Sequence, residues 1–390
     1  MLKVCLILPK GLPVPNVKGG AIESLVTDLI NQNEIEKKLD ITVYSIYNEK
    51  AEELSKKYEM TKCKYIKNNL KYKFKALYVR LLNLFGNKFN TYNELILDEI
   101  KYENFDYIMV EDGAFFSFES YLKYYRKDQM ILHFHHNGIS DKRTDNTFST
   151  FIGVSDFVVN TFKQSSSIKD CYSLKNGINL NKFNKELSSK ERNNIRKKIG
   201  LNKDDFVVMF CGRLIKEKGV LELVKAIKQI ENENIKLMIV GSINFGNIAT
   251  SEYQDALNNE INSSNGKVVA TGFVNYSEIY KYYKTADIAV IPSLWEDAAP
   301  LVNIETMACG LPNIITKTGG APEYISKETI VISKENVIEN IKENVINLYN
   351  DSKKREKMTK AGLKTSKEFS TENFYNNFVS VFIKKEKYYE

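Results

Sequence analysis

Short apolar runs alternate with longer mixed segments along the whole 390-residue chain. This alternation is typical of parallel β-sheets that carry helices on both faces, so the predicted fold is α/β. A turn at Gly19 and Gly20 is predicted to open a helix over residues 22–32. The predicted strands cover residues 3–8, 41–45, 107–111, 130–135, 151–154 and 173–174 in the first half, and residues 206–211, 236–240, 268–271, 288–292, 313–316 and 330–332 in the second.

A chain of this length usually exceeds what one hydrophobic core supports, so two domains are expected. The hydrophobic fraction of 43% and the low count of 7 prolines argue against disorder. A polar, charged stretch over residues 179–200 separates the two sheet-forming halves and is the predicted linker. The predicted organisation is one Rossmann-like domain over residues 1–180, a second over residues 181–370, and a C-terminal amphipathic helix over residues 371–390.

The cysteines and the apolar runs indicate a compartment. Five cysteines are an odd number, lie far apart and include no C-x-x-C pair, so they match neither a disulfide framework nor a zinc site. The apolar residues 1–10 are predicted to form the first strand rather than a signal sequence. No run approaches the ~20 apolar residues that span a bilayer. The protein is therefore expected in the cytoplasm, either soluble or at the inner face of the membrane.

The net charge of +7 is unevenly distributed, because residues 61–90 contain seven lysines and one arginine but no acid. Within this segment, residues 70–85 can form a helix with one aromatic and leucine face and one lysine face. Such a helix predicts contact with an anionic membrane surface or another anionic partner. The alternative is an ordinary surface helix whose apolar face packs on its own domain.

Residues 286–324 say most about function. They predict a strand, a polar turn that carries Glu296 and Asp297, a helix that opens near Leu301, and then a second strand and a glycine turn. A strand–loop–helix unit presents unpaired backbone N–H groups and the positive end of a helix dipole, which suit phosphate. Carboxylates beside such a site can accept hydrogen bonds from sugar hydroxyls. The combination predicts a ligand with both parts, a nucleotide sugar.

Two cations lie where another apolar strand ends. Arg213 follows Gly212 directly, and Lys218 precedes a helix that is predicted to begin near Gly219. Cations at the carboxyl end of a strand, beside a helix N-terminus, suit a diphosphate group. The alternative is a pair of solvated loop cations.

All three histidines of the chain lie within four residues, at the end of the predicted strand 130–135. His133 and His135 share one face because strand side chains alternate, while His136 faces away. A metal cluster is not favoured, because there is no nearby cysteine and no acid before Asp141. A neutral histidine can instead donate to or accept from a sugar hydroxyl or a phosphate.

The spacing of Asp297 and Glu305, followed by MACGLP and GGAPE, resembles the E-x7-E region of family 4 glycosyltransferases. The run GRLIKEKG from Gly212 to Gly219 resembles the phosphate-binding motif of that family, and the histidine run resembles its first-domain histidine motif. Two positions depart from the family pattern: Asp297 replaces a glutamate, and Pro300 stands where a glycine is common.

The resemblance implies a GT-B fold, in which two Rossmann-like domains face each other across a cleft that holds the donor. The first domain would bind the acceptor, the second would bind the nucleotide sugar, and the C-terminal helix would pack back on the first domain. The implied activity is retaining transfer of a hexose from a nucleoside diphosphate sugar, with a UDP-sugar as the expected donor. The acceptor would be a hydroxyl of a glycan or a lipid-linked acceptor in cell-surface polysaccharide biosynthesis, and no metal or other cofactor would be needed.

The resemblance also implies roles for individual residues. Arg213 and Lys218 would stabilise the leaving phosphate, Glu305 would hold the ribose, Asp297 would orient the hexose, and His135 would contact the donor sugar. Further donor-binding residues would be Gly19, Gly20, His133, Gly212, Gly241, Phe273, Ser277, Glu296, Ala298, Ala299, Leu301 and Val302.

Two other functions remain open at this point. A non-hydrolysing sugar-nucleotide epimerase shares the two-domain fold but uses more acids and histidines in its cleft. A non-enzymatic protein that binds anionic ligands would fit the positive charge. Nucleic acid is not an expected partner, because the aromatic and basic region is confined to one helix and matches no recognised nucleic-acid motif.

Overall fold

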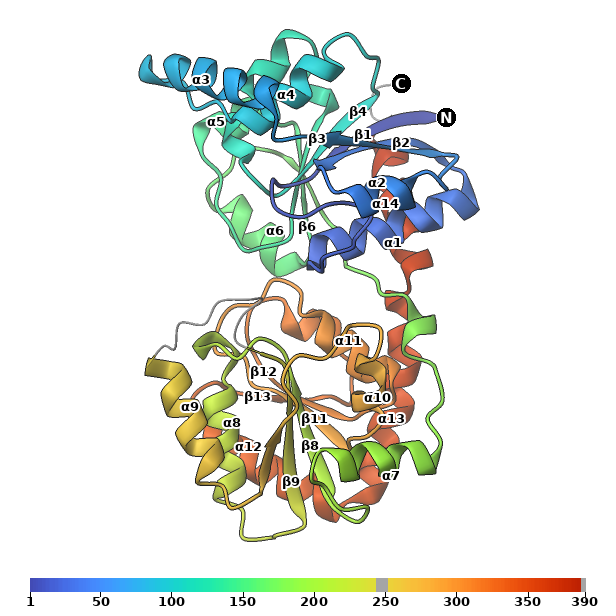
Figure 1. Ribbon diagram of the computed structural model, residues 1–390, viewed down its shortest axis with the longest axis vertical. Coiled ribbons are helices and arrows are strands. Elements are labelled where there is room, and N and C mark those ends of the chain that lie inside the picture. The colour runs from blue at the N-terminus through green and yellow to red at the C-terminus, as the bar shows by residue number, and fades with distance from the viewer. Residues whose placement is uncertain (243–251, 387–390) are drawn as a thin grey trace. The chain divides into compact units, whose positions relative to one another are not determined.

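The computed structural model describes residues 1–242 and 252–386, and it divides into two compact units. The first unit is Met1–Gly177 together with the segment that starts at Thr371, and the second unit is Ile178–Ser370. The predicted boundaries lay after residues 180 and 370. Each unit holds one parallel sheet with helices on both faces (Figure 1).

The sheet of the first unit has seven parallel strands in the order β3-β2-β1-β4-β5-β6-β7. Six of them overlap predicted strands, but β3, which lies within the basic segment 61–90, was not predicted. β3 is an edge strand, and only its first and last residues, Thr61 and Ile66, are buried. The strands are β1 Leu2–Ile7, β2 Leu39–Ile46, β3 Thr61–Ile66, β4 Tyr107–Glu111, β5 Met130–Phe134, β6 Thr150–Gly153 and β7 Asp170–Ser173.

The C-terminal helix α14 belongs to the first unit, where it lies beside α1 (Figure 1). Its Tyr375 hydroxyl donates to Asn33 Oδ1 on α1 at 2.6 Å, and Phe378 and Phe382 are fully buried in the core below. The helices of this unit are α1 Ala21–Glu36, α2 Glu49–Ser55, α3 Leu70–Leu84, α4 Thr91–Ile100, α5 Lys142–Thr147, α6 Asp156–Lys163 and α14 Thr371–Glu386, with short 3-10 helices at Phe115–Ser117, Glu119–Lys123 and Lys127–Gln129.

The sheet of the second unit has six parallel strands in the order β10-β9-β8-β11-β12-β13. Its strands are β8 Phe206–Cys211, β9 Ile235–Val240, β10 Val268–Ala270, β11 Ile288–Ile291, β12 Asn313–Thr316 and β13 Ile330–Ile332. Its helices are α7 Ser189–Lys198, α8 Val220–Lys228, α9 Glu252–Asn262, α10 Ile279–Tyr283, α11 Leu301–Ala308, α12 Val337–Asn350 and α13 Ser352–Ser366, with 3-10 helices at Leu180–Lys182, Lys216–Lys218, Ala321–Tyr324 and Lys367–Phe369.

Each strand order reverses once, between β1 and β4 in the first sheet and between β8 and β11 in the second. At such a point the loops that leave two neighbouring strands run to opposite sides, which opens a crevice at the carboxyl ends of the strands. Open α/β sheets bind their ligands there. The two reversal points therefore indicate where a site can form in each unit.

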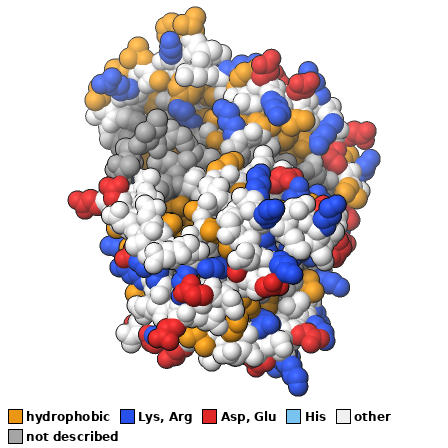
Figure 2. Space-filling view, turned by 60° about the horizontal axis from the view of Figure 1, so that its bottom comes forward, with side chains coloured by type: hydrophobic (Ala, Val, Ile, Leu, Met, Phe, Trp, Pro, Cys, Tyr) orange, Lys and Arg blue, Asp and Glu red, His pale blue; other side chains and the backbone are white. Residues whose placement is uncertain are grey.

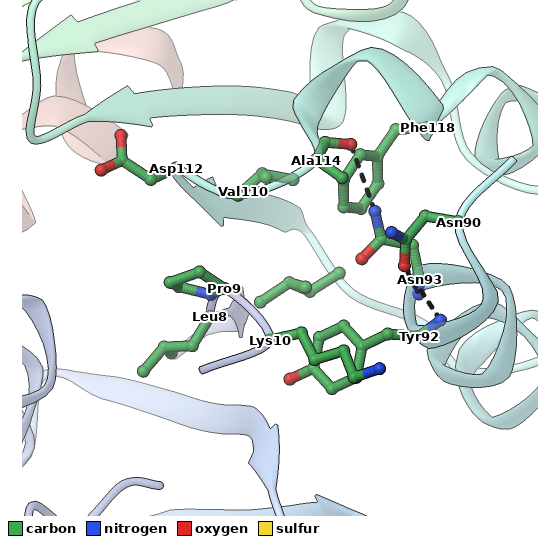
Figure 3. A pocket seen from close by; sticks show the side chains of 12 residues that line it. Leu8, Pro9, Lys10, Asn90, Tyr92, Asn93, Val110, Asp112, Ala114 and Phe118 are labelled. Carbon is green, nitrogen blue, oxygen red and sulfur yellow. Dashed lines mark hydrogen bonds between the residues drawn. The ribbon is translucent and has the colours of Figure 1, made fainter. Parts of the chain in front are cut away.

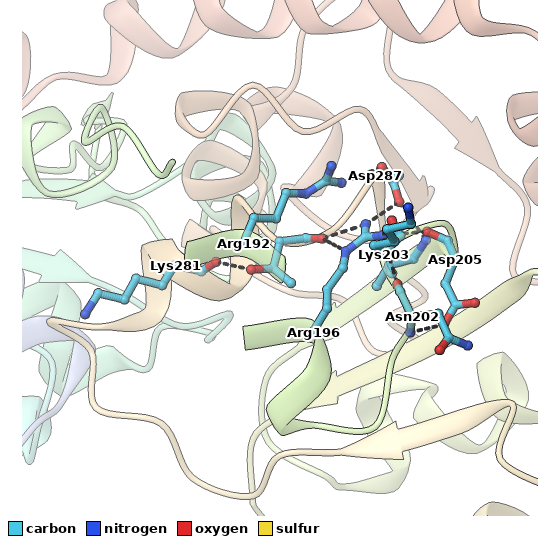
Figure 4. A network of polar contacts seen from close by, with 9 residues as sticks. Arg192, Arg196, Asn202, Lys203, Asp205, Lys281 and Asp287 are labelled. Atoms are coloured by element: carbon cyan, nitrogen blue, oxygen red, sulfur yellow. Dashed lines mark hydrogen bonds and ion pairs between the residues drawn. The ribbon is translucent and has the colours of Figure 1, made fainter. Parts of the chain in front are cut away.

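Residues 179–200, the predicted linker, are instead fixed to the second unit. They contain α7, whose Arg196 is only 1% exposed. The Arg196 guanidinium donates to the carbonyl oxygen of Thr285 at 2.9 Å and to Asp287 Oδ2 at 2.9 Å (Figure 4). A third donor of the guanidinium reaches the carbonyl oxygen of Asp205 at 2.7 Å. Arg196 therefore fixes this stretch to the second unit, although most of the other polar side chains in it are exposed.

The charged side chains are dispersed over the face of the molecule shown in Figure 2. Lys and Arg side chains there alternate with Asp and Glu side chains and do not form one continuous basic band. Within residues 1–242 and 252–386, no helix is both long and apolar enough to cross a membrane.

Candidate active site

Two helices begin beside the reversal point of the second sheet without a side-chain cap. Helix α8 starts after Gly219, which follows the loop from β8, and α11 starts after Pro300, which follows the loop from β11. The first backbone N–H groups of an uncapped helix carry partial positive charge and can donate hydrogen bonds to an anion. The sequence predicted both helix starts, and the sheet order places them beside the same crevice.

The two loops are locked together through Gly219. Its φ of 65° is in the left-handed region, and a Cβ at this position would lie 1.9 Å from the carbonyl oxygen of Pro292. Only glycine allows this approach. The carbonyl oxygen of Glu217 in turn accepts from the Leu294 amide at 2.8 Å, so the loop after β8 is hydrogen-bonded to the loop after β11.

Lys218 and Asp297 meet in this crevice. Lys218 Nζ donates to Asp297 Oδ1 at 2.6 Å and to Oδ2 at 2.8 Å, and the hydroxyl of Ser293 donates to Oδ2 at 2.6 Å. The side chains of Lys218 and Asp297 keep 23% and 16% of their surface exposed. An ammonium has three donors and a carboxylate accepts about four hydrogen bonds. One donor of Lys218 and about one acceptor position of Asp297 therefore remain for a ligand.

Glu296 has a structural partner on each side. Lys334 Nζ donates to its Oε1 at 2.8 Å, and the Gly319 amide donates to its Oε2. The hydrogen bond from Lys334 lowers the pKa of Glu296, although partial burial opposes the shift. Of the two neighbouring acids, Asp297 thus faces Lys218, while Glu296 fastens its loop to the glycine turn after β12.

Glu305 lies in the second turn of α11 and is held by two tyrosines. Tyr276 donates to Oε1 at 2.8 Å and Tyr283 donates to Oε2 at 2.7 Å. Burial raises the pKa of Glu305, although the two hydrogen bonds favour its charged form. Two accepted hydrogen bonds leave about two acceptor positions on the carboxylate. A vicinal diol, such as that of a ribose, presents two matching hydroxyl donors.

Gly212 and Gly241 pack against each other at the carboxyl ends of β8 and β9. A Cβ on Gly241, whose φ is 144°, would lie 1.9 Å from the carbonyl oxygen of Gly212. The predicted binder Gly241 therefore also has a packing role. Arg213 is exposed on the turn directly after Gly212.

The other donor-binding residues predicted in this unit are considered next, and their contacts differ. Ala298 and Ala299 lie between Asp297 and Pro300, and Leu301 and Val302 begin α11. Phe273 is 62% exposed, and the Ser277 hydroxyl donates to Asn275 Oδ1 at 3.0 Å within its own turn.

Three side chains of this site were not predicted: Ser293, Tyr276 and Tyr283. Ser293 lies four residues before its partner Asp297, within the predicted turn. Tyr276 and Tyr283 lie 29 and 22 residues before Glu305, and only the folded chain brings them together.

In the first unit, the histidines lie beside two acids that the sequence reasoning missed. In the sequence, no acid lies between the histidines and Asp141. In the folded structure, however, β4 pairs with β5 in a register that sets Glu111 opposite His133. Asp112 follows Glu111 and accepts from the His135 amide at 2.9 Å. The neighbouring strand β4 and the residue after it therefore supply the carboxylates.

Glu111 is only 2% exposed and contacts both inward histidines. Its Oε2 lies 2.6 Å from His135 Nε2, with hydrogen-bond geometry, and 2.8 Å from His133 Nδ1. The second contact lacks hydrogen-bond geometry, and neither ring nitrogen of His133 has a hydrogen-bond partner in the described part of the chain. His136, on the other face, pairs with Asp112 Oδ1 at 2.9 Å.

Glu111, His133 and His135 could together offer three ligand atoms to a metal ion. Ligand atoms around a tetrahedral ion with bonds near 2.1 Å would lie roughly 3.4 Å apart. The observed separation of 2.6 Å between Glu111 Oε2 and His135 Nε2 is shorter and fits a hydrogen bond better. The arrangement therefore favours a hydrogen-bonded pair over a metal centre.

Gly19 and Gly20 precede α1 as predicted, and both have positive φ values. The Asn16 side chain accepts from the Gly19 amide at 2.8 Å, and a Cβ on Gly20 would lie 2.1 Å from Glu23 Oε2. Burial raises the pKa of Glu23, and the charge of His135 opposes that shift. The glycine turn thus makes room for a buried carboxyl group that is close enough to affect His135.

A small pocket lies at the reversal point of the first sheet, between the loops after β1 and β4 (Figure 3). Asn90 caps α4 at one side of the pocket, accepting from the Tyr92 amide at 3.0 Å, and Lys10 lines another side. Lys10 Nζ donates to the hydroxyl of Tyr72 on α3 at 2.6 Å. The sequence had indicated no residue of this pocket.

The comparisons with known proteins agree with these two units. Residues 191–365 match the family model described as Glycosyl transferases group 1. Spore coat protein SA of Bacillus subtilis is 27% identical over 405 residues, which cover 98% of this chain and 100% of that protein. An uncharacterised glycosyltransferase of Methanocaldococcus jannaschii is 39% identical over 154 residues, 39% of this chain and 38% of its own length. A capsular polysaccharide biosynthesis glycosyltransferase of Staphylococcus aureus is 30% identical over 216 residues, 52% of this chain and 53% of its own length.

Solved structures show the same fold. HepE of Anabaena in complex with UDP has a TM-score of 0.75 at 16% identity, covering 98% of this chain and 100% of that one, and HepE has also been solved with UDP-glucose. A glycosyltransferase of Rickettsia africae has a TM-score of 0.78 at 18% identity, covering 99% of each chain. The predicted GT-B class of two Rossmann-like domains is confirmed.

Proposed function

We propose that this chain is a glycosyltransferase of the group 1 type and that it transfers a hexose from a UDP-sugar, with retention, to a hydroxyl of a glycan or lipid-linked acceptor. The pairing of Lys218 with Asp297 at the reversal point of the second sheet carries the proposal. It joins a cation suited to phosphate with an acid suited to a sugar hydroxyl, beside two uncapped helix N-termini. The Staphylococcus aureus relative supports a place in polysaccharide biosynthesis.

In the proposed reaction, the bond between the anomeric carbon and the β-phosphate oxygen breaks, and a bond to the acceptor oxygen forms on the same face. The acceptor proton passes to the leaving phosphate. Negative charge grows on that phosphate, and the free donor of Lys218, Arg213 and the first amides of α8 and α11 would stabilise it. These groups supply the positive charge that a divalent ion would otherwise provide, so we propose that no metal is needed.

The two carboxylates would bind different parts of the donor. The remaining acceptor position of Asp297 would bind a hexose hydroxyl, and the two remaining positions of Glu305 would bind the ribose hydroxyls. UDP is favoured over other nucleotides because the structurally similar HepE was solved with UDP and UDP-glucose. The epimerase and the non-enzymatic binding protein are not favoured, because the relatives named above include transferases and no epimerase.

Trp295 offers a direct test of donor binding. It is the single tryptophan of the chain and lies two residues before Asp297. UDP, UDP-glucose, GDP and GDP-mannose would be titrated while its fluorescence is recorded. We expect saturable changes with the uridine ligands, and we expect the Lys218→Ala variant to bind them more weakly. If no nucleotide changes the fluorescence or the melting temperature of the protein, the proposed donor site is wrong.

We also propose that α3 docks on an anionic membrane surface, which would bring a lipid-linked acceptor to the enzyme. Seven large apolar side chains on and next to this helix are each more than 50% exposed, and of its residues only Val79 is buried. The alternative in which the apolar face packs on its own domain therefore fails. The exposed residues are Leu70, Phe74, Leu77, Tyr78, Leu81, Leu84 and Phe85.

The spacing of these residues forms one stripe along the helix, because residues three or four apart share a face. The opposite face holds α3 to the first unit through Tyr72, which contacts Lys10, and Lys75, which pairs with Asp98 on α4 at 2.7 Å. At about 100° per residue, Lys71 lies on one side of the apolar stripe, and Lys73 and Arg80 lie on the other. An apolar stripe flanked by cations suits the interface of an anionic bilayer.

A further inference from the structure

Glu111 and His135 form a buried pair at the carboxyl ends of two adjacent strands. Glu111 is the last residue of β4, and His135 follows the last residue of β5. The side chains of both are at most 8% exposed, and Oε2 lies 2.6 Å from Nε2. A carboxylate so close to an imidazole nitrogen determines which nitrogen carries the proton.

The backbone of His135 is fixed as well. Its amide donates to Asp112 Oδ1 at 2.9 Å, and the same oxygen accepts from His136 Nδ1 at 2.9 Å. Asp112 has a φ of 51°, a left-handed conformation that asparagine and aspartate adopt more readily than most residues. Both ends of the His135 residue are therefore held by acids, Glu111 at the end of β4 and Asp112 directly after it.

The other ring nitrogen of His135 is left for a ligand. In residues 1–242 and 252–386, the structure gives Nδ1 of His135 no hydrogen-bond partner, whereas Nε2 has Glu111. His133 behaves differently, because it is 1% exposed and neither of its ring nitrogens hydrogen-bonds to the described residues. Of the two inward histidines, His135 is thus the one that is oriented by a hydrogen bond through one ring nitrogen while the other nitrogen has none in the described residues.

We propose that Glu111 is a positioning residue that binds His135 through Nε2–H and thereby leaves Nδ1 for an oxygen of a substrate at this end of the first sheet. The role of Nδ1 rests on the proposed function, but the orientation of the ring does not. Glu111 would not touch the substrate. It would fix the ring and stabilise positive charge on it, so that Nδ1–H can donate to an oxygen that becomes negative during transfer.

The charges around the ring agree with this assignment. The titratable groups that act on His135 are Glu111, Asp112, Glu23, His133 and His136. Burial lowers the pKa of His135, but the hydrogen bond that it donates to Glu111 and the charges of the three acids outweigh burial, so the pKa is raised. Burial lowers the pKa of His133. For Glu111, burial favours the neutral form, yet the two histidines bring its pKa down to about 2.

The chain has only three histidines, so the proposal can be tested by nitrogen NMR of the intact protein without substrate. Each signal can be assigned with His133→Ala, His135→Ala and His136→Ala variants. We expect His135 to carry its proton on Nε2 when neutral and to become fully protonated at a higher pH than an ordinary histidine. A neutral His135 that is protonated on Nδ1 would overturn the proposal.

The Glu111→Gln variant provides the second measurement. We expect the His135 pKa to fall and kcat to decrease on the order of tenfold or more, with a smaller change in the KM of the donor. Glu94→Gln is the matched control, because Glu94 is another buried acid of the same unit and bonds to Ser120 instead of a histidine. An unchanged His135 titration in Glu111→Gln would contradict the proposal even if the variant is inactive.

The NMR measurement tests the Glu111–His135 pair independently of the proposed sugar transfer. If the wild-type NMR signals are as expected but no sugar is transferred, the pair exists and the proposed activity is wrong. If the glutamine variant does not fold, the wild-type signals still decide which nitrogen carries the proton. Stoichiometric zinc binding that is lost in both His133→Ala and Glu111→Gln would show a metal site in place of the proposed pair.

Discussion

Lys218 and Asp297 are 79 residues apart in the sequence, yet Lys218 Nζ lies 2.6 and 2.8 Å from the two carboxylate oxygens of Asp297. One residue comes from the loop after β8 and the other from the loop after β11, the two strands between which the order of the sheet reverses. Each residue therefore holds the other in place before any donor binds. Such pre-organisation lowers the cost of arranging charges during reaction.

The first prediction concerns this pair. Lys218→Ala should lower kcat/KM on the order of 100-fold or more, because a positioned charge that stabilises the leaving group is lost. Initial rates with a UDP-sugar and circular dichroism would be measured together. Lys216→Ala is the control, since Lys216 is exposed in the same short 3-10 helix. Equal losses in both variants would assign the effect to the general charge of the loop and not to Lys218.

The second prediction is that Glu305→Gln stabilises the folded protein at higher pH and at the same time weakens UDP binding. The pKa of Glu305 is raised in the folded protein, so its ionisation costs stability as the pH rises from its ordinary value of 4.5 through the raised value. Glutamine does not ionise, so the variant does not lose this stability as the pH rises. Relative to the wild type, the free energy of unfolding of the variant should therefore increase between pH 4.5 and pH 8, while UDP binding weakens. Urea unfolding followed by Trp295 fluorescence would measure the first effect.

Tyr283→Phe is the matched variant for Glu305. It removes the donor to Oε2 and leaves the carboxylate buried with one fewer partner, which should cost about 1–3 kcal/mol at pH 8. A Glu305→Gln variant that becomes less stable than the wild type as the pH rises would refute the prediction.

The third prediction concerns the exposed stripe of α3. Lys73→Glu with Arg80→Glu should weaken binding to phosphatidylserine vesicles by more than about 30-fold, since each cation near an anionic surface contributes about 1 kcal/mol. Phe74→Ser with Leu81→Ser should also release the protein, because the apolar stripe is lost. Sedimentation with vesicles at two salt concentrations would measure both effects.

The control for the stripe is Lys50→Glu with Lys56→Glu, which changes the charge of the same unit equally at two exposed positions around α2. No sedimentation of the wild type with anionic vesicles would disprove the membrane proposal. If the wild type is a dimer that Leu81→Ser makes monomeric, the stripe binds a second copy of the chain instead.

The fourth prediction is that Arg196→Met destabilises the second unit by about 3–5 kcal/mol, because its buried partners lose their donor. Asp287 would keep Arg192 and the Val207 amide, but the carbonyl oxygens of Thr285 and Asp205 would be left without the guanidinium. Trp295 lies in the same unit and reports its unfolding in urea. Lys198→Met, at an exposed position of the same helix, should change stability by less than about 0.5 kcal/mol.

Local patterns in the sequence predicted the local parts of this structure. The ranges of β4, β8, β12 and β13 were predicted to the residue, and α11 begins at Leu301, near where it was predicted, because each has a clear apolar run or a proline at its boundary. Strand β3 was missed, since an edge strand that buries only its ends lacks the usual pattern.

Contacts between distant residues could not be predicted in the same way. The pairing of Glu111 with the histidines depends on β4 lying beside β5, and the tyrosines that hold Glu305 come from the turn before α10 and from α10 itself. The prediction that residues 179–200 form a linker was wrong for the same reason. Arg196 looks like one cation among many in a polar stretch, and only the carbonyl groups that surround it show that it is buried.

Helix α14 connects the end of the chain to its beginning. Since Phe378 and Phe382 complete the core that β1 and α1 begin, the first unit cannot be finished until the ribosome has translated the whole of the second. A nascent chain would therefore carry an open apolar surface throughout most of its synthesis. Any stop codon shortly before residue 371 would leave that surface exposed permanently, which makes such truncated chains natural targets for chaperones and proteases.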